Sequence, residues 1–212
     1  MEQNRRKKHR VLTFITVFSL LAVMATVLYA VLPTAEESRL YDGFIRLHVI
    51  ANSDSEADQA LKLKVRDAIL CDVSDLLADC HDFAQADQIL AATTDRLVST
   101  ASAAVKAEGA SDRVTVLLGD EYYPTRGYDG MRLPAGVYRS LRICIGEAAG
   151  HNWWCVLFPP LCIQSAEPQT QLVEAGFTEG QVRILTENEN PRYVLKFRFL
   201  EWFAEWKNRV GG

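Results

Sequence analysis

The chain has 212 residues, a net charge of −4 at neutral pH and five cysteines. The first ten residues, MEQNRRKKHR, contain five Lys/Arg against one Glu, so the remainder holds 18 basic and 26 acidic residues, a net charge of −8. This acidic balance argues against a nucleic-acid partner, which requires a basic protein face. No Gly/Ser linker, repeat or low-complexity run divides the remainder, and its length predicts a single hydrophobic core.

An uncharged apolar run, residues 11–32, follows the basic segment. As a helix it would measure about 33 Å at ~1.5 Å per residue, enough to cross a hydrocarbon core of roughly 30 Å. The basic flank lies on the N-terminal side only, so the positive-inside rule puts the N-terminus in the cytoplasm and the domain outside. A signal peptide cleaved near Ala30 or Ala35 is the alternative, and it exports the same domain. The predicted organisation is a basic cytoplasmic tail at 1–10, a transmembrane anchor or signal sequence at 11–32, a linker at 33–43 and an extracytoplasmic domain at 44–212.

The domain begins with a strand pattern followed by helix patterns. Residues 44–51, FIRLHVIA, alternate in character, which predicts a strand. The capping cluster NSDSEAD comes next, and Ser53, Asp54 or Ser55 is the expected N-cap of a helix over ALKLKVRDAILCDVSDLL. A second helix is predicted over about 84–108, where apolar side chains again recur at helical spacing.

The middle of the chain predicts strands and turns. RVTVLLG (113–119) has a strand pattern, and the Gly, Pro and Asp residues of 122–136 predict a structured loop. Residues 137–146 alternate over their whole length, and 153–158 predict a return strand that pairs with them in a hairpin. Leu195, Phe199, Trp202 and Trp206 recur at helical spacing, so a helix is expected from about 191 to 209, although KFRFLEW within it also fits a strand. Helices early and late with antiparallel strands between them indicate an α+β domain, with a mostly antiparallel sheet and flanking helices.

The segment HNWWCVLFPPLC, which begins at His151, concentrates reactive and aromatic side chains. Cys155 and Cys162 either close a disulfide loop around Pro-Pro or remain two buried free thiols. A catalytic thiol at Cys155 is disfavoured, because four positions along a strand put His151 about 13 Å away. Strict alternation places Trp153 with Cys155 on one face of the strand and Trp154 on the other. Core packing of both rings and partner contact by one of them are both open.

The remaining motif chemistry does not indicate catalysis. The C-x6-C spacing has no companion pair of ligands such as a zinc site requires. The sequence has no G-x-S-x-G, no phosphate-binding loop and no G-x-G-x-x-G. We therefore predict no metal, no cofactor and no small-molecule substrate, and the residues favour recognition over catalysis.

Three long blocks of the domain resemble the stage II sporulation protein R family of endospore-forming bacteria. They are RLHVIANSDSEADQALKLKVRDAIL, YPTRGYDGMRLPAGVYRSLRICIG and NWWCVLFPPLC, in the family's order. The resemblance implies a protein made in the forespore and located in the forespore membrane or secreted into the space between forespore and mother cell. There it would activate a membrane-embedded aspartic protease of the mother cell, which cleaves the pro-form of sigma factor E. The resemblance thus implies an activator and no enzyme.

The positions that match these blocks supply candidate contact residues. We expect the exit of the first strand, the loop 123–136 and the Trp segment to form one surface that faces the protease. Turn or cap formation is an alternative role for Asn52, and an ion pair within the fold is an alternative for Arg126. The predicted partner-binding residues are His48, Asn52, Asp54, Tyr123, Arg126, Trp153 and Trp154.

A second class of function stays open at this point. It is an extracytoplasmic hydrolase that acts on the cell wall or septum and uses His48 with Asp54 or Cys155. Replacing His48 by Gln or Cys155 by Ser would abolish such an enzyme. A protein ligand would instead lose activity mainly through misfolding or through the loss of exposed aromatic side chains.

Overall fold

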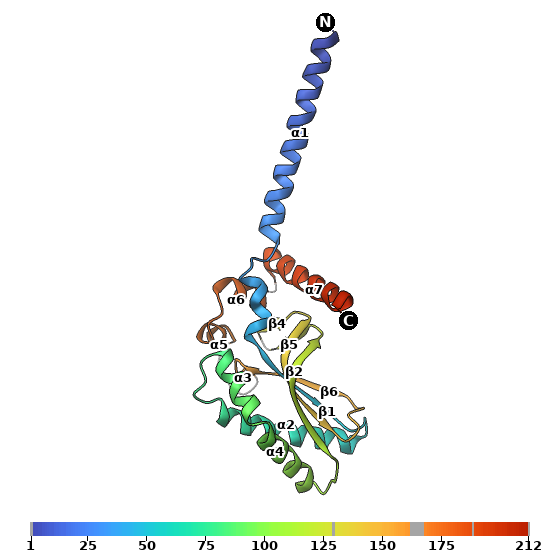
Figure 1. The fold of residues 1–212 in the computed structure, drawn as a ribbon, viewed down its shortest axis with the longest axis vertical. Helices are drawn as coiled ribbons and strands as arrows, with labels where there is room; N and C mark the ends of the chain where they lie inside the picture. The colour runs from blue at the N-terminus through green and yellow to red at the C-terminus, as the bar shows by residue number, and fades with distance from the viewer. Residues whose placement is uncertain (1, 129, 162–167, 188, 212) are drawn as a thin grey trace.

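A long N-terminal helix and an α+β domain make up the molecule. Figure 1 shows the helix, α1 (Glu2–Val31), projecting from a domain in which helices surround a central sheet. Within α1 the run Leu12–Tyr29 is long and apolar enough to cross a membrane or to serve as a signal sequence. The α+β class agrees with the sequence prediction. The computed structural model describes residues 2–128, 130–161, 168–187 and 189–211.

Short helices and a hairpin add to the elements that the sequence predicts. After α1 the chain forms a 3-10 helix, η1, and then the first strand of the sheet. The elements are η1 (Glu37–Gly43), β1 (Ile45–Ile50), α2 (Glu56–Leu76), α3 (Phe83–Ala92), α4 (Thr94–Ala107), β2 (Val114–Tyr123), β3 (Arg126–Tyr128), β4 (Met131–Leu133), β5 (Gly136–Ile145), β6 (Asn152–Phe158), α5 (Pro168–Glu174), α6 (Glu179–Thr186) and α7 (Pro191–Gly211).

The four-stranded sheet is mixed and has the order β2-β5-β1-β6. β5 is antiparallel to β2 and parallel to β1, and β6 is antiparallel to β1. The predicted hairpin of β5 with β6 is therefore wrong, because β1 lies between them. This central position gives the backbone groups of β1 partners along both edges. The turn after β5 crosses the exit of β1, where the N–H groups of Ala149 and Gly150 donate to the carbonyls of Asn52 (3.1 Å) and Ala51 (2.9 Å).

One face of the sheet packs against α2 and α4. Ser55 is the N-cap of α2 among the three candidates, since its Oγ accepts a hydrogen bond from the N–H of Asp58 at 3.1 Å. The single helix predicted over 84–108 is two helices, α3 and α4, separated at Thr93. Thr93 has φ −109° and ψ 12°, outside the helical region, and its Oγ1 donates to the carbonyl of Ile89 at 2.7 Å.

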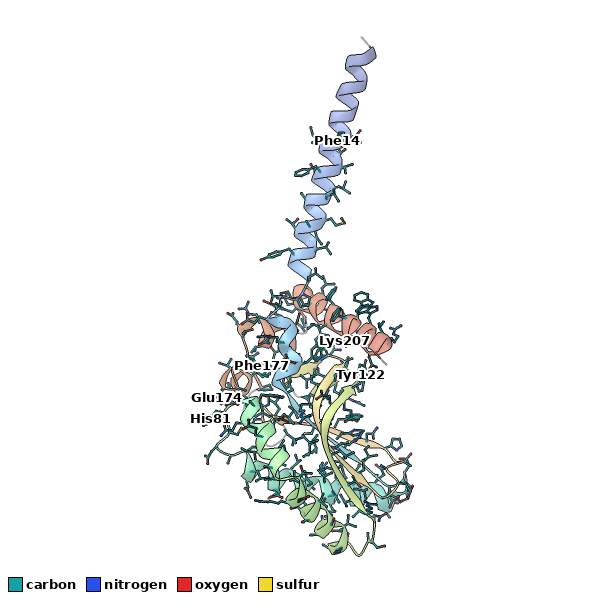
Figure 2. The ribbon with its side chains drawn as sticks, viewed as in Figure 1. Phe14, His81, Tyr122, Glu174, Phe177 and Lys207 are labelled. Carbon is teal, nitrogen blue, oxygen red and sulfur yellow. The ribbon has the colours of Figure 1, made fainter. Side chains whose placement is uncertain are left out.

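The opposite end of the domain has a second core formed by η1, α6, α7 and the β3–β4 hairpin. Leu40, Phe44 and Phe197 are buried there, and the rings of Phe44 and Phe177 lie 4.7 Å apart. Figure 2 labels Phe177, which lies beside η1. The predicted C-terminal helix is confirmed as α7, and the strand alternative for KFRFLEW is wrong. The predicted loop 122–136 contains the end of β2 and the hairpin.

Candidate functional site

The face of the sheet that α2 and α4 do not cover bears a group of buried polar and aromatic side chains. Register places Arg46 beside Ser140, and His48 lies between Arg142 and Trp154 on the neighbouring strands. In β2, Gly119 pairs with Ser140 and Leu117 pairs with Arg142. Alternate residues of a strand point to the same side, so Glu121 and Tyr123 point to this same face. We call the group the Arg46–His48 cluster; its members are Arg46, His48, Glu121, Tyr123, Ser140 and Trp154.

Glu121 connects the polar members of the cluster. Its Oε1 lies 2.9 Å from the Nδ1 of His48, and its Oε2 accepts a hydrogen bond from the Oγ of Ser140 at 2.8 Å. Since the Ser140 hydroxyl donates to Glu121, the hydroxyl of Tyr123 donates to the Ser140 oxygen, at 2.6 Å. Burial raises the pKa of Tyr123 well above its ordinary value. The phenol therefore stays protonated and keeps its role as a donor in this chain of hydrogen bonds.

Arg46 is completely buried, although arginine is seldom found in protein cores. Its guanidinium carbon lies 3.9 Å from the ring centroid of Tyr123 and 4.9 Å from that of Tyr138. One of its terminal nitrogens donates to the hydroxyl of Tyr128 at 2.7 Å. The Nε and the other terminal nitrogen have no hydrogen-bond partner among the described residues. Contacts with aromatic rings thus hold the cation in place of a carboxylate.

His48 is held by stacking as well as by Glu121. Its ring is parallel to that of Trp154, with 3.8 Å between centroids, and the Trp154 ring also contacts Tyr123 edge-on at 4.7 Å. The Nε2 of His48 is buried and has no partner among the described residues. The exposed guanidinium of Arg126 lies 5.6 Å from the ring centroid of Trp154. Arg126 and half-buried Trp154 therefore form an accessible edge of a network whose other members are buried or, like Glu121, partly buried.

The structure brings four of the seven predicted contact residues together, namely His48, Tyr123, Arg126 and Trp154. Asn52 lies at the other end of β1, where its Oδ1 accepts from the N–H of Glu147 at 2.9 Å and its Nδ2 donates to Asp58 at 3.0 Å. These bonds give Asn52 the turn-forming role considered as its alternative. Asp54 is beside it, exposed, and pairs with His151. Asn52 and Asp54 therefore lie apart from these four, although the N–H of His151 donates to Asp54 at 2.6 Å and joins the Trp segment to the exit of β1.

Trp153 and Cys155 point to the helix-covered face, as strict alternation predicts. The guanidinium of Arg66 in α2 lies 4.3 Å from the ring centroid of Trp153, so this ring packs under a helix. Cys155 is disulfide-bonded, whereas its predicted partner, Cys162, lies outside the described residues. The residues proposed for a hydrolase are not assembled, since Cys155 and His48 are on opposite faces of the sheet.

The sequence analysis did not predict Glu121, Ser140 or Arg142 as residues of the site. The alternation of 137–146 already places Ser140 and Arg142 on one face of their strand, which is the signal that could have selected them. Glu121 lies in the extension of β2 beyond the predicted strand, and no local pattern marks it. No group of three or more His, Cys, Asp or Glu residues that could hold a metal ion occurs within the described part of the chain.

Comparisons with known proteins agree on one family. The family model described as "Stage II sporulation protein R (spore_II_R)" matches residues 41–168, a range that contains the whole cluster. A protein of Bacillus subtilis (strain 168) named "Stage II sporulation protein R" is 30% identical over 182 residues, which cover 77% of this chain and 81% of that relative. No solved structure matches the chain.

Proposed function

This chain belongs to the stage II sporulation protein R family, and we propose that it is an exported signalling protein of sporulation. In this proposal it activates a membrane-embedded aspartic protease of the mother cell and so triggers processing of the pro-form of sigma factor E. The protein is made in the forespore and reaches the space between the two cells through its N-terminal apolar helix. Family membership over residues 41–168 is the observation that carries the proposal.

The accessible edge of the Arg46–His48 cluster is the contact site that we propose for the protease. An exposed Arg over a half-buried Trp is a combination found at energetically important interface positions. The buried members beneath hold the Trp154 ring from two sides, through His48 and Tyr123. A ring fixed in this way loses little conformational freedom on binding, which favours affinity.

The direct test combines the full chain, the protease and the sigma-factor precursor in one heterologous host and follows precursor cleavage. We expect cleavage to depend on the full chain. Arg126→Ala should reduce cleavage about tenfold, the effect of losing roughly 1.4 kcal/mol of contact energy at one interface arginine. Arg113→Ala is the matched control, because Arg113 is also exposed but precedes β2 at the opposite end of the sheet.

Two outcomes would contradict the proposal. Cleavage without the chain would remove the activator role altogether. Equal cleavage with Arg126→Ala and Arg113→Ala, at equal protein levels, would move the contact site away from the cluster.

Because no hydroxyl or thiol among the described residues is hydrogen-bonded to the Nε2 of His48, no nucleophile is aligned with the His48–Glu121 pair. This geometry favours the activator proposal over the hydrolase alternative.

A further inference from the structure

Helix α7 has two apolar faces, and only one of them packs against the domain. Tyr193, Phe197 and Leu200 are buried in the second core. The other face carries side chains spaced by three or four residues that stay exposed: Trp202 is 56% exposed, Trp206 50% and Val210 68%, with Leu195 on the same side. A soluble helix normally presents polar residues to water on this side. The outer face therefore lacks its partner in the isolated molecule.

The position of α7 relative to α1 indicates what covers this face. α7 contacts α1 and lies across the end of the domain from which α1 leaves (Figure 1). Glu37, six residues beyond the end of α1, accepts hydrogen bonds from the Nζ of Lys196 at 2.5 and 2.6 Å. This buried ion pair attaches the first half of α7 directly below the candidate membrane span. The face of α7 directed away from the domain is thus on the same side as the membrane that α1 would cross.

The composition of α7 suits a lipid surface. The helix contains five basic and two acidic residues; with Lys196 buried against Glu37, the other four basic residues still outnumber the two acidic ones, in a chain whose residues after the first ten carry −8. Basic charge attracts anionic headgroups, and tryptophan prefers the boundary between headgroups and acyl chains. Tyr122 and Lys207, labelled in Figure 2, mark the region where the end of β2 approaches the C-terminal half of the helix. The inner side of the first half of the helix is covered by the domain through Tyr193, Phe197 and Leu200.

We propose that α7 lies in the interface of the membrane that α1 enters, with Leu195, Trp202, Trp206 and Val210 in contact with lipid. The helix and α1 then form two attachments that fix the orientation of the domain on the membrane surface. The Arg46–His48 cluster would be presented at a defined height and angle instead of moving freely at the end of a single tether. Should α1 be removed as a signal sequence, α7 would remain as a weaker, reversible attachment.

Tryptophan fluorescence of the full chain in phospholipid vesicles tests this proposal. The vesicles contain zwitterionic and anionic phospholipid with acyl chains brominated near the headgroup, and identical vesicles lack bromine. Trp153→Phe/Trp154→Phe leaves only the tryptophans of α7, and Trp202→Phe/Trp206→Phe leaves only those of β6. We expect bromine to reduce the emission of the first variant and to leave the second unchanged. The wild type keeps the tryptophans of both β6 and α7, so bromine should quench its emission in part.

The contrary results are equally clear. If bromine leaves the emission of the α7 tryptophans unchanged while aqueous iodide quenches it, the outer face points into water and the proposal fails. That result would assign the face to a protein partner or to a second copy of the chain. Equal quenching of both variants would also overturn the proposal, since the domain would then lie on the membrane through its sheet.

Discussion

Arg46 is the residue whose environment departs most from what its type prefers. A fully buried guanidinium among tyrosine rings, with two nitrogen atoms unpartnered among the described residues, carries a desolvation cost that stacking only partly offsets. A planar, weakly hydrated cation tolerates such a place better than a compact ammonium group. This buried cation lies beneath the proposed contact site, where it stacks against Tyr123, a ring that also contacts Trp154.

Two substitutions at Arg46 separate shape from charge. We expect Arg46→Lys to lower the free energy of unfolding by about 2 kcal/mol, because an ammonium group loses the stacking and leaves a strongly hydrated charge buried. Arg46→Met should be tolerated within about 1 kcal/mol, since a neutral chain of similar volume needs no hydration. Urea unfolding of the detergent-solubilised chain, followed by circular dichroism, measures both. Equal stability of the two variants would contradict stacking as the main support of Arg46.

At the scale of elements, the Glu37–Lys196 pair joins η1 to α7. Both side chains are more than nine-tenths buried. Burial alone would raise the pKa of Glu37, but the hydrogen bonds from Lys196 and Thr34 lower it below its ordinary value of 4.5. A carboxyl group with a lowered pKa in the folded state stabilises the fold above its unfolded-state pKa, and this stabilisation is lost as the pH falls through the folded-state pKa.

We expect Glu37→Gln to lower the free energy of unfolding at pH 7 by about 3–5 kcal/mol, because it leaves the Lys196 charge buried and unpaired. The wild type should lose part of this difference when the pH is lowered below about 4.5. Denaturant titrations from pH 7 to pH 3 measure both effects. Glu179→Gln is the control, since its pair with Arg183 is exposed and should contribute less than about 1 kcal/mol. Equal losses in the two variants would show that burial does not strengthen the Glu37 pair.

Helix α7 shows that hydrophobic periodicity predicts a helix but does not predict which of its faces is buried. The recurrence of Leu195, Phe199, Trp202 and Trp206 correctly predicts a helix, but most of this stripe faces away from the core. The residues that pack inward are Tyr193, Phe197 and Leu200. Periodicity identifies the helix because both stripes share the same repeat. Which stripe becomes core depends on the partner surface, which lies far away in the sequence.

At the scale of the molecule, the basic tail, the apolar helix and the acidic domain imply one orientation across a membrane. Cys71 is exposed on α2, whereas Cys80 and Cys144 are half-buried and burial raises the pKa of each thiol. A thiol with a raised pKa holds less reactive thiolate near neutral pH. Cys71 is therefore the best natural site among the described cysteines for labelling the domain.

We expect a membrane-impermeant maleimide to label Cys71 in intact cells that express the full chain, because the positive-inside rule predicts that the domain lies outside the cytoplasm. Cys71→Ser should remove most of the label. A cysteine introduced into the basic tail by Gln3→Cys, in the Cys71→Ser background, should react only after permeabilisation. Labelling of Cys71 only after permeabilisation would reverse the proposed topology. Mass measurement of the modified protein reads out each case.

Local sequence by itself determined several features of this protein. The apolar helix, an N-cap of α2 at Ser53, Asp54 or Ser55, the alternation around Trp153 and Trp154 and the C-terminal helix follow from residues within a few positions of one another. The blocks that resemble the family also lie in continuous segments, so family membership is readable from sequence. His48, Tyr123 and Trp154 meet at the cluster because their strands bring one parity of side chains to one face, and Arg126 reaches it from the separate β3–β4 hairpin.

Only the tertiary structure decided how these parts combine. The insertion of β1 between β5 and β6 depends on hydrogen bonds between strands about 90 to 110 positions apart in the chain, and no local pattern encodes that order. The burial of Arg46 and the role of Glu121 follow from it, since each depends on neighbours from other strands. Asn52 and Asp54 are apart from the cluster because they lie beyond the end of β1, where Asn52 bonds Glu147 and Asp58. Side-chain pattern is a short-range property, whereas strand order and burial are settled by long-range contacts that compete for the same core.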